Sequence, residues 1–326
     1  MKNNLPIWLE DYFDQIGRGL SHHAFLILGK KGLGKSLFAE YLAEKLLCQN
    51  AETNDCSSCF ACNLENIDDH PDYHTLNVLD GKKLISIEQF PELVLKLFET
   101  PFLQKNKVAV LNLDSCNHHG FNSLLKILEE PPKNTFFIFT SSFRHLIPET
   151  ILSRCLNINI ETPSTKDALS WLSEFTEEEA KMSLTLTDNC PILAKEYLKT
   201  NTMQTREEFI NDISGIIKSG KDIVTISKKW IEDLDTLPMK VEWMVKILYD
   251  TIKFHADDSL QKLTEDTDNI SRYLSQNTHI EKVHNLLTQT NAIWSQFSSD
   301  SNLNKEYQLN SLFIDWEKLL GISKKV

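Results

Sequence analysis

A glycine-rich segment at residues 29–36 has the composition of a phosphate-binding loop. It reads Gly-Lys-Lys-Gly-Leu-Gly-Lys-Ser and matches the pattern G-x-x-x-x-G-K-[ST]. In such a loop backbone N–H groups point at phosphate oxygens, the lysine contacts the outer phosphates, and the serine hydroxyl can bind Mg²⁺. A glycine-rich turn that binds no ligand is the alternative. The predicted nucleotide ligands are Gly29, Gly32, Gly34, Lys35, Ser36 and Leu37.

An aspartate follows the apolar run Val108–Leu113, where a neighbouring strand would end. Such a carboxylate can hold Mg²⁺ beside the loop serine, and we predict this role for Asp114, with a simple turn aspartate as the alternative. The next residue, Ser115, is a weak base at neutral pH unless another base activates it. We therefore expect ATP or ADP with Mg²⁺ to bind and ATP to be hydrolysed poorly. Thr140, which ends another apolar run, is expected to contact the terminal phosphate.

Four of the seven cysteines lie close together, with the spacing C-x7-C-x2-C-x2-C. Four thiolates at this spacing suit tetrahedral Zn²⁺, and a closed site of this kind is structural. An Fe–S cluster is one alternative, although no other feature indicates redox chemistry, and cysteines without metal are another. The predicted zinc ligands are Cys48, Cys56, Cys59 and Cys62.

An arginine stands in the short sequence Ser153-Arg154-Cys155, after the apolar run Phe136–Thr140. It can be an ordinary surface charge. Its functional interpretation is an arginine finger, which stabilises phosphoryl charge in the active site of a neighbouring subunit. We predict this catalytic role in trans for Arg154.

These residues all lie in the first half of the chain, where short apolar runs alternate with helical patterns. This alternation is typical of a parallel sheet that is covered by helices on both faces. Phe121, Leu124, Leu125 and Leu128 share one face of a predicted helix that stops before Pro131. The predicted strands are Phe25–Leu28, Tyr73–Leu79, Val108–Leu113, Phe136–Thr140 and Leu156–Ile160.

The second half of the chain has few strand signals after Pro163. Residues 165–200 are expected to form three short helices, with breaks near Thr176 and at Asn189-Cys190-Pro191. Longer amphipathic patterns follow from residue 205. Their apolar and aromatic stripes are interpreted as core or subunit contacts.

Composition limits the class of protein. The chain has 326 residues, 41% of them hydrophobic and 25% charged, which is ordinary for two or three globular domains. No apolar run approaches the roughly 20 residues of a membrane span, and residues 1–10 lack a signal-peptide pattern, so we expect a cytoplasmic protein without a membrane partner. The net charge is −12. A nucleic-acid binder is usually basic, so any action on DNA would depend on partners that carry positive charge.

Together these motifs resemble the delta-prime family of bacterial DNA polymerase III clamp-loader subunits, which are AAA+ proteins. The phosphate loop and the cysteine spacing carry part of the resemblance, which is specific over about residues 20–160. Further matching segments are Ser21-His22-His23-Ala24, His70-Pro71-Asp72-Tyr73, residues 122–132 and Ser153-Arg154-Cys155.

The resemblance implies an α/β plus all-α fold with three domains. These are an AAA+ parallel-sheet nucleotide-binding domain over 1–162 with a zinc module at 48–62, a three-helix lid over 163–204, and a helical collar over 205–326. It also implies structural Zn²⁺ on the four cysteines, and Arg154 directed at the ATP site of an adjacent motor. The implied partners are the gamma/tau and delta subunits and, through the complex, the sliding clamp and primer–template DNA at the nucleoid-associated replisome.

The implied function is that of a stator-like, non-motor subunit that helps to load the clamp. DNA-directed DNA polymerase activity, a nucleotidyltransferase reaction, would then belong to the complex, and this chain would be neither polymerase nor active ATPase. A gamma/tau-like motor ATPase is one alternative, although motors carry Asp-Glu where this chain has Asp114-Ser115, and a lid arginine where it has residues 189–192. A nucleotide-independent scaffold is the other. Some delta-prime relatives lack the loop lysine, but this chain retains Lys35 and Ser36.

Overall fold

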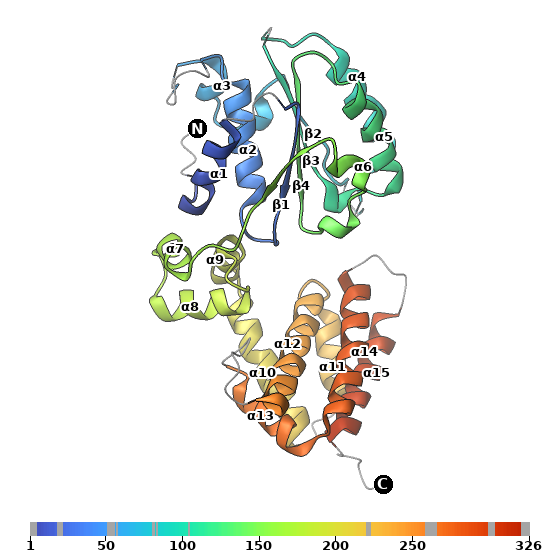
Figure 1. Ribbon diagram of the computed structural model, residues 1–326. Coiled ribbons are helices and arrows are strands. Elements are labelled where there is room, and N and C mark those ends of the chain that lie inside the picture. The colour runs from blue at the N-terminus through green and yellow to red at the C-terminus, as the bar shows by residue number, and fades with distance from the viewer. Residues whose placement is uncertain are drawn as a thin grey trace. The chain divides into compact units, whose positions relative to one another are not determined.

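The computed structural model describes residues 5–17, 22–50, 56, 58–79, 82, 84–103, 105–219, 223–257, 266–298 and 304–320. Ser21, and residues 51–55 and 57 of the predicted zinc module, lie outside this set. The chain forms two compact units (Figure 1). One comprises residues up to Ala180 with Asn189–Lys195, and the other comprises Lys181–Asp188 with residues from Glu196 onward. The three-domain boundaries near residues 163 and 205 stay predictions.

A parallel sheet of five strands forms the centre of the first unit, in the order β2-β3-β4-β1-β5. All five strands were predicted from the sequence, but β2 ends four residues earlier than expected. It is an edge strand that pairs with β3 over three residues. The strands are β1 (Ala24–Leu28), β2 (Tyr73–Thr75), β3 (Lys107–Asn112), β4 (Thr135–Ser141) and β5 (Leu156–Asn159).

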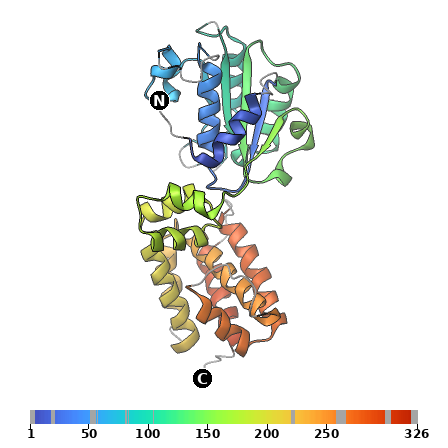
Figure 2. The same cartoon turned by 60° about the vertical axis from the view of Figure 1, so that its left-hand side comes forward.

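Helices cover both faces of this sheet (Figures 1 and 2). All five residues of β1 are buried, because successive side chains point to opposite faces and both faces carry an apolar cluster. Phe25 and Ile27 pack in the cluster of α1 and α2, and Leu26 packs in the cluster of α4, α5 and α6. The helices are α1 (Ile7–Gly17), α2 (Lys35–Leu47), α3 (Phe60–Asn63), α4 (Gln89–Phe98), α5 (His118–Glu129) and α6 (Glu149–Leu152), with 3₁₀ turns η1 (Ile67–Asp69), η2 (Leu113–Ser115) and η3 (Arg144–Leu146).

Three short helices follow the sheet, with the breaks that the sequence predicts. They are α7 (Thr165–Trp171), α8 (Glu177–Leu186) and α9 (Pro191–Lys199). Thr176 starts α8 with a capping box, because its hydroxyl accepts from the Glu179 N–H while the Glu179 carboxylate accepts from the Thr176 N–H. Asp188 and Asn189 have φ of 52° and 59°. This left-handed backbone cannot continue a helix, so it separates α8 from α9.

The second unit is helical in its described part. Trp230, Trp243 and Trp316 are almost completely buried in its core. The apolar helix faces that carry these residues therefore form the core of this unit. None of the described helices has the length and apolar character that a bilayer span requires. The helices from residue 202 onward are α10 (Thr202–Ser219), α11 (Ile223–Glu232), α12 (Leu237–Ala256), α13 (Asp268–Asn277), α14 (Ile280–Ser298) and α15 (Lys305–Leu320).

A buried ion pair joins α10 to the turn before α13. The guanidinium of Arg206 is fully buried and donates to both carboxylate oxygens of Asp266, at 2.8 and 2.7 Å. The same guanidinium lies 5.2 Å from the ring centroid of Phe209 and 4.9 Å from that of Trp243. Removing one partner of such a bidentate pair is costly in free energy, because the remaining charge is then poorly compensated.

We expect Arg206→Ala to lower the free energy of unfolding by about 3 kcal/mol, because it leaves the Asp266 carboxylate without its partner and opens space between two aromatic rings. Chemical denaturation followed by circular dichroism measures this loss. The control is Arg272→Ala, which removes a 39% exposed arginine that contacts Asp268 at 3.5 Å and lies 4.7 Å from the Phe254 ring centroid. That change should cost less than about 1 kcal/mol. Equal losses in the two variants would contradict the assignment.

Candidate functional site

The glycine-rich segment lies between β1 and α2, as the sequence predicts. Gly29 follows the last residue of β1, and Lys35 is the first residue of α2. Gly32 and Gly34 have φ of 84° and 92°. Side chains other than glycine are strained in this left-handed region, so the loop conformation depends on these two positions. Six of the predicted ligands, at residues 29–37, therefore lie in one continuous segment formed by the loop and the first turn of α2.

The ammonium group of Lys35 bridges the start of the loop and the end of β4. Its Nζ donates to the carbonyl oxygens of Gly29 and Lys30, both at 2.9 Å, and to the Ser142 hydroxyl at 3.0 Å. Burial lowers the pKa of Lys35 from its ordinary value, and the negative charge of Asp114 opposes this effect. The cation is therefore held in a polar cage at the place where a phosphate-binding lysine is expected.

Asp114 joins the ends of β3 and β4. Its carboxylate accepts from the Ser141 hydroxyl at 2.6 Å and from the Ser142 N–H at 2.8 and 3.0 Å. Ser142 also accepts from Lys35, so a continuous set of hydrogen bonds runs from the aspartate to the loop lysine. Sequence reasoning missed Ser142. The available signal was its position two residues beyond the end of the predicted strand Phe136–Thr140, whose last residue was chosen as a ligand.

The remaining predicted nucleotide ligands occupy positions of different exposure. Ser36 is exposed in the first turn of α2 and Leu37 is half-buried. Thr140 is buried in β4, with 5% of its surface exposed. Their roles as ligands stay predictions.

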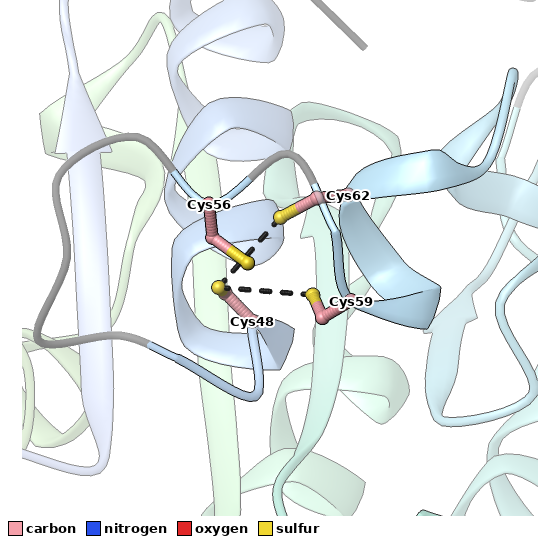
Figure 3. Close-up of side chains that lie close together, drawn as sticks. All are labelled: Cys48, Cys56, Cys59 and Cys62. Carbon is pink, nitrogen blue, oxygen red and sulfur yellow. Dashed lines mark hydrogen bonds between the residues drawn. The ribbon is translucent and has the colours of Figure 1, made fainter.

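The four clustered cysteines meet at the far end of α2 (Figure 3). All four Sγ atoms lie within 4.8 Å of one another, and that of Cys48 is 3.9 Å from Cys59 and 3.6 Å from Cys62. Four sulfurs at about 2.3 Å from a tetrahedral zinc are about 3.8 Å apart. The cluster can therefore hold a metal ion with little movement of its ligands. Cys48 follows the last turn of α2, and Cys59 and Cys62 belong to the start and body of α3.

The thiols of the cluster differ in acidity. Backbone N–H groups of Ser58 and Cys59 lower the pKa of Cys56 to about 6, so this sulfur favours the thiolate near neutral pH. Burial raises the pKa of Cys48 and of Cys62. A divalent cation would offset that cost, because thiolates are the form that binds metal.

Two side chains fix the end of α2 beside the cysteines. Lys105 Nζ donates to the carbonyl oxygens of Cys48 and Gln49, at 2.6 Å for Gln49, and the Asn106 amide donates to that of Leu46 at 2.7 Å. The last carbonyls of a helix have no partner within it, so these bonds satisfy them. They also bring a positive charge close to the cluster.

Arg154 lies on a different part of the unit. Its guanidinium donates to the Glu129 carboxylate at 2.8 Å, at the end of α5, and to the carbonyl oxygen of Thr150 at 2.8 Å. About a third of its side chain, 34%, is exposed. The arginine is thus held by a partner within its own chain, which sequence reasoning did not predict.

The start of α9 packs against the phosphate loop. The Ile192 N–H donates to the Gly32 carbonyl at 3.0 Å. Lys195 points elsewhere, because it pairs with Glu174 at 2.7 Å and lies 5.2 Å from the Trp171 ring centroid. The segment in which a lid arginine was sought therefore meets the loop with main chain and apolar side chains.

A cavity of about 870 Å³ lies beside α1. Its lining includes Trp8, Tyr12 and Asn157, and the lining residues in the described chain do not include any of residues 29–37. This cavity is thus distinct from the phosphate loop, and the candidate site is assigned from the loop geometry.

Two family models match the chain. The model described as "DNA polymerase III, delta subunit" matches residues 7–164, and that described as "DNA polymerase III, delta subunit, C terminal" matches residues 200–318. The chain is 28% identical to DNA polymerase III subunit delta' of Buchnera aphidicola subsp. Schizaphis graminum, over 93% of each chain. It is 32% identical to DNA polymerase III subunit gamma of Buchnera aphidicola subsp. Acyrthosiphon pisum, over 51% of this chain and 46% of that one.

A solved structure shares the fold. The DNA polymerase III gamma subunit-related protein of Thermotoga maritima superposes with a TM-score of 0.50 at 13% identity, covering 95% of this chain and 100% of the other. At this identity the likeness shows the fold alone.

Proposed function

Because the chain belongs to the DNA polymerase III delta' family, we propose that it is a non-motor subunit of a clamp loader, which binds nucleotide without hydrolysing it and completes the active site of a neighbour. The observation that carries this proposal is the end of β3, where Asp114 is followed by Ser115. Lys35 and Asp114 remain in phosphate-loop geometry, but the serine hydroxyl is a poor base for activating water. The site can bind the negatively charged phosphate groups, but it lacks a carboxylate at the position where motor subunits carry glutamate.

Nucleotide recognition would rest on the loop and its lysine. The first turn of α2 supplies N–H groups and partial positive charge for phosphate oxygens, and Lys35 supplies a full charge. The Ser36 hydroxyl and the Asp114 carboxylate are the groups that would hold Mg²⁺, which neutralises phosphate charge when bound. ATP and ADP are both compatible with these roles.

Arg154 is the proposed contribution to a partner. A guanidinium that is one-third exposed and held by one exposed carboxylate and the Thr150 carbonyl can exchange the carboxylate for a phosphoryl group of an adjacent subunit. An exposed ion pair contributes only about 0–1 kcal/mol, so breaking the contact with Glu129 costs little. We infer gamma/tau motor subunits as recipients, with the delta subunit, the sliding clamp and primer–template DNA as further members of the assembly, in the cytoplasm at the replisome.

A motor ATPase is the second candidate function. The observation that favours it is the retained Lys35, together with 32% identity to a gamma subunit over about half of the chain. Turnover measurements on the isolated chain separate the two candidates.

We infer that the metal at the cysteine cluster is zinc. Four cysteine sulfurs at mutual distances that fit a tetrahedron leave no position for a water molecule or substrate, which is typical of structural zinc. The ion would then join the end of α2 to α3.

The first test is nucleotide binding and turnover by the purified chain. We expect ADP and ATP to bind in the presence of Mg²⁺, with no steady-state release of phosphate above background. Lys35→Ala should abolish binding while leaving the fold intact, because it removes the charge that contacts the phosphates. Isothermal titration and a phosphate-release assay measure the two properties. Turnover that disappears in Lys35→Ala would instead establish the motor ATPase.

The second test concerns Arg154. In a loader reconstituted with gamma/tau and delta subunits, Arg154→Ala should lower DNA-stimulated ATP hydrolysis, by up to about 10³-fold at the neighbouring site. Arg154→Lys should restore little, because it lacks the planar fork. Nucleotide binding by the isolated variant should match wild type. Arg272→Ala is the control, and unchanged hydrolysis with Arg154→Ala would rule out the finger.

The third test concerns the metal. Purified chain should contain about one zinc per molecule, and Cys59→Ser should lose most of it, since three thiolates and a hydroxyl bind zinc more weakly. Affinity should fall as pH decreases below neutral, because the thiolates become protonated and the metal needs them deprotonated. Elemental analysis and a chelator-release assay measure both effects. Cys155→Ser is the control outside the cluster, and equal zinc in both variants would contradict the assignment.

A further inference from the structure

Two carbonyl groups of the phosphate loop are held by elements outside the loop. The indole Nε1 of Trp8, in α1, donates to the carbonyl oxygen of Leu33 at 3.0 Å. The main-chain N–H of Ile192, in α9, donates to that of Gly32, also at 3.0 Å. Both bonds bridge segments that are distant in sequence, so neither follows from the loop motif itself.

These bonds fix the orientation of two peptide planes. In a trans peptide the C=O of one residue and the N–H of the next point in opposite directions. The bond to the Leu33 carbonyl therefore sets the direction of the Gly34 N–H, and the bond to the Gly32 carbonyl sets that of the Leu33 N–H. Among the described residues the structure shows no acceptor for either of these N–H groups.

We propose that Trp8 is a positioning residue of the phosphate loop, whose indole holds the Leu33 carbonyl so that the Gly34 N–H is presented to a phosphate group of a nucleoside di- or triphosphate. The first turn of α9 does the same for the Leu33 N–H through Ile192. This inference rests on the proposed nucleotide binding and adds the residues that prepare the site for it.

Packing around the loop restricts other orientations. A Cβ added at Gly32 would lie 2.4 Å from the Cβ of Leu193, and one added at Gly34 would lie 3.0 Å from Cδ1 of Leu9. Leu33 is buried, with 1% of its surface exposed. The loop is therefore held between α1 and α9 before any ligand arrives. Such preorganisation raises affinity, because less conformational entropy is lost on binding.

The neighbouring Trp171 provides a matched control. Its ring meets that of Trp8 edge to face at 5.6 Å, so each tryptophan contributes to the same aromatic pair. Its own indole Nε1 is buried and has no hydrogen-bond partner in the described chain. Trp171→Phe thus makes one ring of the pair smaller and keeps the hydrogen bond to the Leu33 carbonyl. Trp8→Phe also makes one ring smaller, but it removes the donor of that bond.

The experiment compares ADP binding by wild type, Trp8→Phe and Trp171→Phe, with Mg²⁺ present. We expect Kd to rise about three- to tenfold in Trp8→Phe, the effect of one net hydrogen bond, and to stay within about twofold of wild type in Trp171→Phe. The ADP-induced shift of the Gly34 amide resonance should shrink in Trp8→Phe alone. If Trp8 contributed only packing, the ADP-induced shift of the Gly34 amide would change equally in the two variants.

Three results are distinguishable. Equal ADP affinity and equal Gly34 shifts in the two variants would overturn the positioning role while leaving nucleotide binding intact. No binding of ADP to wild type at millimolar concentration would overturn nucleotide binding and, with it, this inference. If Trp8→Phe unfolds, benzothienylalanine at position 8 keeps the ring shape without the N–H. That protein should show the same loss of affinity, and wild-type affinity would overturn the role.

Discussion

The hydrogen bonds from Asp114 through Ser142 to Lys35 are the interaction on which the candidate site depends. They connect β3, the end of β4 and the phosphate loop, which the strand order brings together at the carboxyl ends of adjacent strands. A half-buried ammonium is costly unless opposite charge and acceptors surround it, and these groups provide both. The same set of bonds that keeps the lysine charged therefore also fixes the ends of three strands relative to one another.

Local patterns predicted much of the fold, and long-range contacts account for what they missed. The β1 strand and α5 were predictable because each carries its own apolar period, and the loop and cysteines were predictable because spacing alone defines them. The helix α1 was missed although Trp8, Leu9, Tyr12 and Ile16 recur at helical spacing. Its hydrogen bond to the Leu33 carbonyl spans 25 positions and has no local signal. The contact of Arg154 with Glu129 likewise spans 25 positions, and Ser142 acts through Lys35, 107 positions away. Such pairs exist only after folding, so neither residue's partner was visible in the sequence.

The charges of the chain agree with the proposal that it acts through neighbouring subunits of a complex. Its net charge of −12 does not favour contact with a nucleic-acid backbone, and the partly exposed Arg154 is already paired with Glu129. An exposed pair of this kind is weak, so it orients the guanidinium without binding it tightly. By contrast, Arg206 is fully buried beside aromatic rings and donates to both carboxylate oxygens of Asp266. The two arginines differ in burial, so loss of the Arg154 pair is expected to cost less than loss of the Arg206 pair.

The helix α2 begins at the phosphate loop and ends at the cysteine cluster. Its 13 residues extend about 20 Å, and buried side chains along its whole length pack it onto the sheet. Changes at sites this far apart usually have additive energetic effects, because no shared neighbour couples them. Loss of the cysteines should therefore leave the opposite end of the helix unaltered. Residues at the two ends of α2 can therefore be substituted independently, although one helix joins them.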